Sequence, residues 1–91
     1  MIKSIKSKKI KLFIAGNTSK VDQSHIRSIQ TILTALSTAT CLNDVDLKGR
    51  RLHSFKEKVP TVWSLDVSGN WRITFEILGS DIYNINYVDT H

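Results

Sequence analysis

The sequence predicts an α+β fold, in which two N-terminal helices pack on one face of an antiparallel β-sheet and leave an open polar face. Two observations predict it. Apolar residues recur at helical spacing before residue 40, and three segments after residue 60 alternate apolar and polar residues. Short connections containing Gly, Asn or Ser separate these segments, so neighbouring strands are expected to be antiparallel. The apolar face of such a sheet gives both helices a partner to pack against.

The 91 residues suffice for one domain, residues 1–91, with one modest core. The sequence shows no secretory signal and no apolar run long enough to cross a membrane. The single cysteine, Cys41, cannot form an internal disulfide and is expected to be a small core residue. We therefore expect a soluble cytoplasmic protein without membrane association.

The first forty residues contain the predicted helices. Residues 1–5, MIKSI, can form a short first strand. The helix predicted within residues 6–19 stops at Gly16-Asn17 and has three apolar residues at helical spacing: Ile10, Phe13 and Ile14. Residues 21–39 predict the stronger helix, with Asp22 or Ser24 as N-cap. Its apolar stripe consists of Ile26, Ile29, Leu33 and Leu36. His25 is interpreted as a surface or capping residue.

Residues 41–49 are predicted to form a turn with at most one short helical turn, and residues 50–55 a short strand. The alternating strands follow at residues 61–67, 71–77 and 82–88. Three-residue connections would keep every apolar residue of these strands on one face. The predicted pairs of the first hairpin are Val67–Trp71, Leu65–Ile73, Asp66–Arg72 and Ser64–Thr74. Those of the second are Ile77–Tyr83, Phe75–Ile85 and Ile73–Tyr87. A two-residue second turn is rejected, because it would place both tyrosines on the polar face.

This register divides the side chains between two faces. The predicted core contains Trp63, Leu65, Ile73, Phe75 and Ile85 from the sheet, with Ile29, Leu33 and Leu36 from the helix. The open face is expected to carry His53, Ser64, Asp66, Arg72, Thr74, Glu76, Asn84 and Asn86. Arg72 therefore has two interpretations: a structural pair with Asp66 across the hairpin, or a cation that the sheet presents to a ligand.

Four residues favour the second interpretation. His53 and Lys56 lie three apart where a strand enters a loop, Arg72 lies on the sheet, and His91 follows the last strand. Metal-independent RNA cleavage needs a base for the 2′-hydroxyl, an acid for the leaving oxygen and a cation for the phosphorane. Histidine suits the acid and base roles near neutral pH, and arginine matches phosphate oxygens. We expect no metal and no cofactor.

Charge is concentrated at the N-terminal end. The net charge is +5, and residues 1–30 hold seven bases and one acid. Such a basic region is typical of proteins that bind a polyanion such as RNA. The predicted RNA-binding residues are Lys6, Lys8, Lys9 and Arg51.

Four segments resemble one known family. MIKSIKSKKIKLF, LHSFK, WSLDVSGNWRITFEI and NYVDTH are similar, in order, to motifs of the HigB branch of the RelE-like toxins. The resemblance implies a RelE-like fold and a ribosome-dependent mRNA endonuclease acting in the ribosomal A site. It also implies three partners: a helix-turn-helix antitoxin similar to HigA, ribosomal RNA and mRNA.

By position, the resemblance assigns site roles to His53, Lys56, Arg72 and His91. Thr90 departs from the tyrosine of the family, and threonine cannot stack on a base as tyrosine can. A different function remains open: a non-catalytic relative that poisons DNA gyrase as ParE-like toxins do, or an inactive module that binds antitoxin or nucleic acid.

Overall fold

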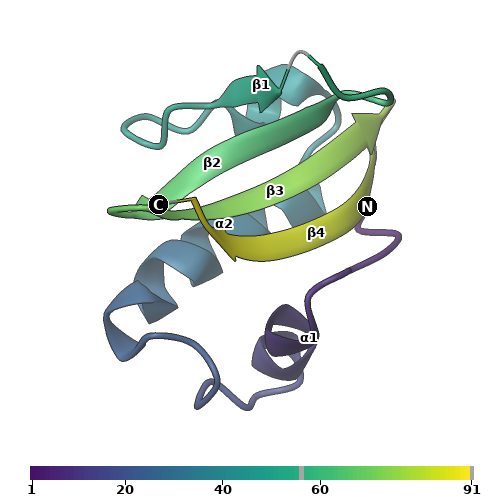
Figure 1. The fold of residues 1–91 in the computed structure, drawn as a ribbon. Helices are drawn as coiled ribbons and strands as arrows, with labels where there is room; N and C mark the ends of the chain where they lie inside the picture. Colours follow the sequence, from purple (N-terminus) through teal and green to yellow (C-terminus); the bar gives the residue numbers. More distant parts are fainter. Residues whose placement is uncertain (56, 91) are drawn as a thin grey trace.

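The computed structural model describes residues 1–55 and 57–90 and confirms the predicted α+β fold (Figure 1). Four strands form one antiparallel sheet in the order β1-β2-β3-β4. They are β1 (His53–Phe55), β2 (Val62–Ser68), β3 (Trp71–Leu78) and β4 (Asp81–Asp89). The helices are α1 (Lys8–Ile14) and α2 (Ile26–Thr38). Both lie on the same side of the sheet, α2 behind its central strands and α1 toward the β4 edge (Figure 1).

The N-terminal segment is less regular than a strand. Residues 1–5 make two isolated parallel bridges to β4, Ile2 with Ile82 and Ile5 with Ile85. Helix α1 begins after Ser7, whose hydroxyl accepts a hydrogen bond from the amide of Ile10 at 3.2 Å. Of its predicted apolar stripe, Ile10 is fully buried and Phe13 partly buried, whereas Ile14 is 53% exposed.

A 3₁₀ turn, Gln23–His25, precedes α2, so the α-helix begins later than the sequence pattern predicts. Asp22 is the N-cap of that turn, and its carboxylate accepts hydrogen bonds from the hydroxyl and amide of Ser24 at 2.7 and 2.9 Å. These hydrogen bonds lower the pKa of Asp22. A second 3₁₀ turn, Leu42–Val45, follows α2.

The core lies between the helices and the sheet, as predicted. Seven of the eight predicted core residues are buried, and Trp63 packs against them while partly buried. Val67, Ile82 and Tyr87 add to the sheet side of this core, and Ile10 and Ile32 to the helix side. The prediction for Cys41 is wrong: this residue is exposed.

The first hairpin contains a bulge that the sequence does not reveal. The pairs Leu65–Ile73, Asp66–Arg72 and Ser64–Thr74 are confirmed. Trp71, however, lies opposite Ser68 rather than Val67, because the register shifts between Asp66 and Ser68. One extra residue therefore sits in β2 beside the turn.

The second hairpin corrects the rejected turn. Leu78 pairs with Asp81, so only Gly79 and Ser80 connect the strands. The two-residue turn places Tyr83 opposite Glu76, and Tyr83 is not part of the core. A register shift further along, where Asn84 has a left-handed φ of 55°, restores the predicted Ile73–Tyr87 pair. The two-residue turn and this register shift together bury nearly the same part of β4 as the predicted three-residue connection would.

No helix in the described parts of the chain is long and apolar enough to cross a membrane.

Candidate active site on the open face of the sheet

Strand register brings the polar residues of the open face into two rows. One row joins His53 to Ser64, Thr74 and Asn86 across all four strands, although Ser64 in the middle of the row is fully buried rather than open as predicted. The next row joins Asp66 to Arg72 and Val88. Because these side chains stand on paired strands, their relative positions do not depend on a flexible loop.

Arg72 is held tightly at one end of this face. Its side chain is only 15% exposed, and its Nε lies 3.0 Å from Oδ1 of Asp66. Its Nη1 donates to the carbonyls of Gly69 at 2.8 Å and Trp71 at 3.3 Å. Although Oδ1 is close to Nε, it accepts no aligned hydrogen bond among the described residues, so this contact is mainly one between charges. The guanidinium is thus preorganised, and its charge is paired with a carboxylate.

Arg50 fixes the backbone that carries Asp66. The Asp66 amide donates to the Arg50 carbonyl at 2.7 Å. In return, Nη1 of Arg50 donates to the carbonyl of Val67 at 2.9 Å, and more weakly to that of Asp66 at 3.4 Å. Arg50 thus donates a hydrogen bond to the backbone at the bulge. Sequence reasoning missed this contact, because nothing in the pattern of β2 marks the bulge.

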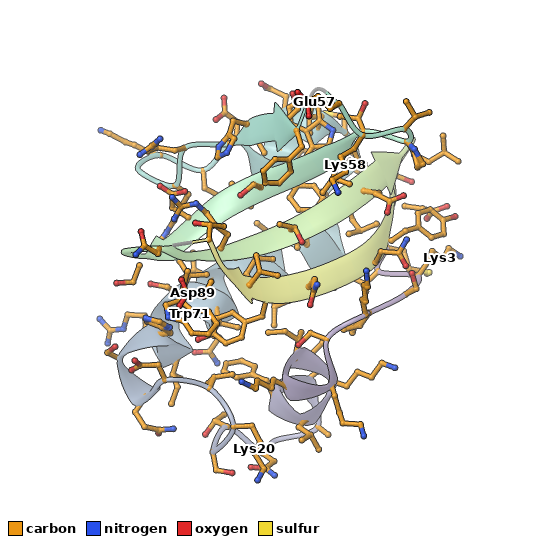
Figure 2. All side chains as sticks on the ribbon, in the orientation of Figure 1. Lys3, Lys20, Glu57, Lys58, Trp71 and Asp89 are labelled. Carbon is orange, nitrogen blue, oxygen red and sulfur yellow. The ribbon has the colours of Figure 1, made fainter. Side chains whose placement is uncertain are left out.

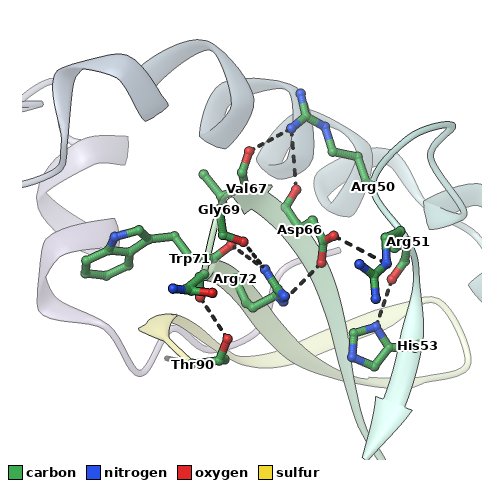
Figure 3. A network of polar contacts seen from close by, with 10 residues as sticks. Arg50, Arg51, His53, Asp66, Val67, Gly69, Trp71, Arg72 and Thr90 are labelled. Carbon is green, nitrogen blue, oxygen red and sulfur yellow. Dashed lines mark hydrogen bonds and ion pairs between the residues drawn. The ribbon is translucent and has the colours of Figure 1, made fainter.

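Asp66 bridges two arginines (Figure 3). Its Oδ2 lies 3.6 Å from Nε of Arg51, while its Oδ1 contacts Arg72. Arg51 is 74% exposed and its backbone is left-handed, with a φ of 51°. A carboxylate between two guanidinium groups occupies the kind of position that a phosphate would need. The Asp66–Arg72 pair is confirmed, whereas its extension to Arg51 was not predicted.

His53 stands beside this bridge and is exposed (Figure 3). Its Nδ1 lies 2.9 Å from the carbonyl oxygen of Arg51. Because a carbonyl only accepts, Nδ1 must carry the hydrogen, and in the neutral ring Nε2 keeps its lone pair. The imidazole and the Phe55 ring form a T-shaped contact, with centroids 5.8 Å apart. His53 can therefore present a basic nitrogen to a ligand on this face.

The other two predicted site residues, Lys56 and His91, lie outside the described residues. The residue before His91 is nevertheless well anchored. The amide and hydroxyl of Thr90 both donate to the carbonyl of Asn70, at 2.8 and 2.9 Å. Asn70 belongs to the same turn as Gly69, whose carbonyl accepts from Arg72. The described chain therefore ends beside the turn that holds Arg72 (Figure 3).

A hollow of about 590 Å³ continues the open face beyond Val88. Its lining consists of Lys6, Phe55, Lys58, Val62, Thr74, Glu76, Asn84, Asn86 and Val88. Lys58 stands over the sheet in Figure 2. Of the predicted RNA-binding residues, Lys6 lines this hollow and Arg51 lies at the bridge, whereas Lys8 and Lys9 are exposed on α1.

The opposite side of the same strands holds a buried aromatic cluster. His25 is 4% exposed, and its Nδ1 lies 2.7 Å from the hydroxyl oxygen of Tyr87. Trp71 stacks on Tyr87 with centroids 4.5 Å apart. The interpretation of His25 as a surface or capping residue is wrong for the side chain. His25 stands at the N-cap position of α2, but its side chain makes no cap hydrogen bond and is directed inward against this cluster. Burial raises the pKa of Tyr87, partly offset by a hydrogen bond from the backbone of Asp22.

Within residues 1–55 and 57–90, no three His, Cys, Asp or Glu side chains gather as a metal site would require.

Comparison with known proteins identifies the family of the chain. A family model described as "RelE-like toxin of type II toxin-antitoxin system HigB" matches residues 3–91. The chain belongs to the HigB-like toxin family. A curated protein of Proteus vulgaris, named "Endoribonuclease HigB", is 40% identical to this toxin over 92 residues, covering 100% of both chains. Membership of a toxin–antitoxin system implies that this toxin has an antitoxin partner.

Proposed function

We propose that this toxin is a ribosome-dependent endoribonuclease, which cleaves mRNA in the ribosomal A site and thereby inhibits translation. The observation that carries the proposal is the fixed guanidinium of Arg72, which shares the carboxylate of Asp66 with Arg51. His53 stands next to Arg51, and the turn that holds Arg72 also anchors Thr90 (Figure 3). The relative from Proteus vulgaris, whose name gives an endoribonuclease activity, supports RNA cleavage. The toxin would act in the cytoplasm, where ribosomes are found.

The proposed reaction uses the nucleophile that RNA supplies. The 2′-hydroxyl attacks the adjacent phosphorus, the bond from phosphorus to the 5′-oxygen breaks, and a cyclic phosphate and a 5′-hydroxyl result. Nε2 of His53, or the amine of Lys56, takes the proton of the 2′-hydroxyl. Arg72 stabilises the charge of the phosphorane, and His91 protonates the leaving oxygen. No step in this scheme requires a metal ion.

Substrate binding involves charge beyond the reacting groups. Lys6, Lys8 and Lys9 would dock the toxin on ribosomal RNA, and Arg51 would contact the RNA backbone next to Arg72. Exposed cations of this kind provide sequence-independent attraction to phosphates. The antitoxin partner would be a helix-turn-helix protein similar to HigA.

One observation favours a second candidate function. Asp66 already occupies both arginines, and a carboxylate competes with phosphate for the same donors. A toxin with this site blocked would be a non-catalytic relative, such as a gyrase poison of the ParE type or a module that only binds antitoxin or nucleic acid.

Induced expression followed by mapping of mRNA 5′ ends separates the two candidates. The parent toxin should create new 5′ ends within translated codons, and Arg72→Ala should abolish them. Arg27→Ala is the matched control, because Arg27 is exposed on α2, on the other side of the sheet. Growth arrest without new 5′ ends would favour the non-catalytic candidate.

A further inference from the structure

Two separate parts of the chain carry the candidate groups of the open face. Arg51 and His53 lie just before and at the start of β1. Asp66 and Arg72 lie on the hairpin of β2 and β3. Strand β1 is only three residues long, and its described pairing with β2 covers just these residues. A base and a cation on such different supports keep a fixed relation only if a further contact ties the two parts together.

Arg50 makes that contact with both its backbone and its side chain. Its carbonyl accepts a hydrogen bond from the Asp66 amide at 2.7 Å. Its guanidinium reaches the other way in Figure 3, where Nη1 donates to the Val67 carbonyl at 2.9 Å. Both partners belong to β2 at the register shift beside the turn that holds Arg72. One residue therefore fixes the start of β1 to the hairpin at the point where the ladder is irregular.

The residue after Arg50 has a strained backbone. Arg51 has a φ of 51°, a left-handed value that is unfavourable for a residue other than glycine. Such a conformation persists only where the surrounding structure holds it. Arg50 holds one end of this segment through its contacts with β2, and the β1 ladder holds the other end from His53 onward.

The conformation of Arg51 decides what its two polar ends meet. Its carbonyl oxygen lies 2.9 Å from Nδ1 of His53, and its Nε lies 3.6 Å from Oδ2 of Asp66. The first contact sets the tautomer of the imidazole, with the hydrogen on Nδ1 and the lone pair on Nε2. The second joins Arg51 to the carboxylate that also contacts Arg72. Releasing Arg50 from β2 would therefore loosen both contacts at once.

We propose that Arg50 is a positioning residue for RNA cleavage. It acts through Arg51, and it keeps the basic nitrogen of His53 in a fixed place relative to the guanidinium of Arg72. The side chain of Arg50 is partly buried and is directed at backbone carbonyls, so it does not itself contact the RNA. The inference rests on the proposed function, because it takes His53 and Arg72 as groups that act on the RNA.

The first test measures single-turnover cleavage on programmed ribosomes by purified, folded Arg50→Met, in which the stem of the side chain remains and its donors are lost. The maximal rate should fall about 10- to 100-fold, because a misplacement of about 1 Å can have that effect. The ribosome concentration that gives half of the maximal rate should change no more than in Arg27→Met. That control removes an exposed charge from α2 and should keep the parent rate. Arg50→Lys, which can still donate to the Val67 carbonyl, should recover most of the rate.

The second test does not depend on cleavage. The ring nitrogen NMR signals of His53, assigned from their absence in His53→Asn, report which nitrogen carries the hydrogen. At a pH where the ring is neutral, the parent should show a protonated Nδ1 and an unprotonated Nε2. Arg50→Met should shift both signals toward those of an imidazole that exchanges between its two tautomers. Arg27→Met should leave both signals in place.

The two measurements separate this inference from the proposed function. If the parent cleaves and folded Arg50→Met cleaves equally fast, or leaves the His53 signals unchanged, the positioning role is overturned while the proposed function stands. A loss that appears only as weaker ribosome binding also overturns it, because Arg50 would then contact RNA. If the parent does not cleave, the proposed function fails, and a change of the His53 signals in Arg50→Met still supports the connection from Arg50 to His53.

Discussion

Asp66 and Arg72 form an ion pair across strands β2 and β3, with Oδ1 of the carboxylate 3.0 Å from Nε of the guanidinium. Both side chains are mostly buried, at 18% and 15% exposed. The same carboxylate reaches Arg51 on its other side. The pair therefore orients the main cation of the open face and also competes with any phosphate that binds there.

Replacing Asp66 by alanine tests which of these two effects is stronger. We expect Asp66→Ala to keep or raise the cleavage rate, because both arginines become available to phosphate. The loss of one cross-strand pair should cost only about 0.2–1 kcal/mol of unfolding free energy. Single-turnover cleavage on programmed ribosomes measures the rate, and Asp46→Ala is an exposed control. A folded Asp66→Ala protein with reduced activity would show that Asp66 is needed to orient Arg72.

Phe75 tests the core. Phe75 is fully buried between the sheet and the helices, so Phe75→Ala should lower the free energy of unfolding by about 3–5 kcal/mol. In a chain this small, that loss could unfold the protein. Urea denaturation measures the change. Leu78→Ala, on the same strand but 74% exposed, should have little effect, and equal effects of the two substitutions would contradict the burial of Phe75 in the core.

The buried hydroxyl of Tyr87 predicts a pH dependence at the alkaline end. Because burial raises the pKa of Tyr87 above its ordinary value of 10.0, the unfolded chain releases this proton at a lower pH than the folded chain. The contribution of Tyr87 to the free energy of unfolding is therefore fully present below its ordinary pKa of 10.0. It is lost as the pH rises toward the pKa in the folded protein. As the pH rises from about 9 to 11, on either side of the ordinary pKa, the free energy of unfolding should fall less for Tyr87→Phe than for the parent. If the free energies of unfolding of the parent and Tyr87→Phe change identically over this pH range, the prediction for Tyr87 is wrong.

The lysines at the N-terminal end predict a salt effect. Replacing Lys6, Lys8 and Lys9 together with alanine should weaken ribosome binding and flatten its dependence on salt, because fewer counterions are released. Binding measured across a salt series gives the slope. The control replaces Lys20, Arg27 and Lys48, which are also exposed. If the first triple variant keeps the parent slope, these lysines are merely solvated or face the antitoxin.

The sequence determined the fold class because its two periodicities are clear. Helical spacing in α2 and alternation in β2, β3 and β4 suffice to place Leu65, Ile73 and Phe75 in the core. The local irregularities were not predictable in this way. A left-handed Asn84 and a bulge at Val67 change the pairing without changing which residues are apolar.

For the site, the register of β2 and β3 was enough to predict the Asp66–Arg72 pair. The contacts of Arg50, Arg51 and His25 were not predictable, because they depend on how irregular segments return to the sheet. Arg51, which approaches Asp66, lies before β1 and has a left-handed backbone. His25 lies in a 3₁₀ turn and points inward from it. Neither segment has a periodic pattern that would indicate its direction.

Cleavage of mRNA on programmed ribosomes by purified, folded Arg72→Ala tests the account most directly. Arg72 is proposed to stabilise the phosphorane, so its removal should reduce the cleavage rate by about 100- to 1000-fold, as the loss of one preorganised donor typically does. Arg27→Ala should cut at the parent rate. If Arg72→Ala also cuts at the parent rate, Arg72 serves only as the structural partner of Asp66, and the catalytic role proposed for this face of the sheet is wrong.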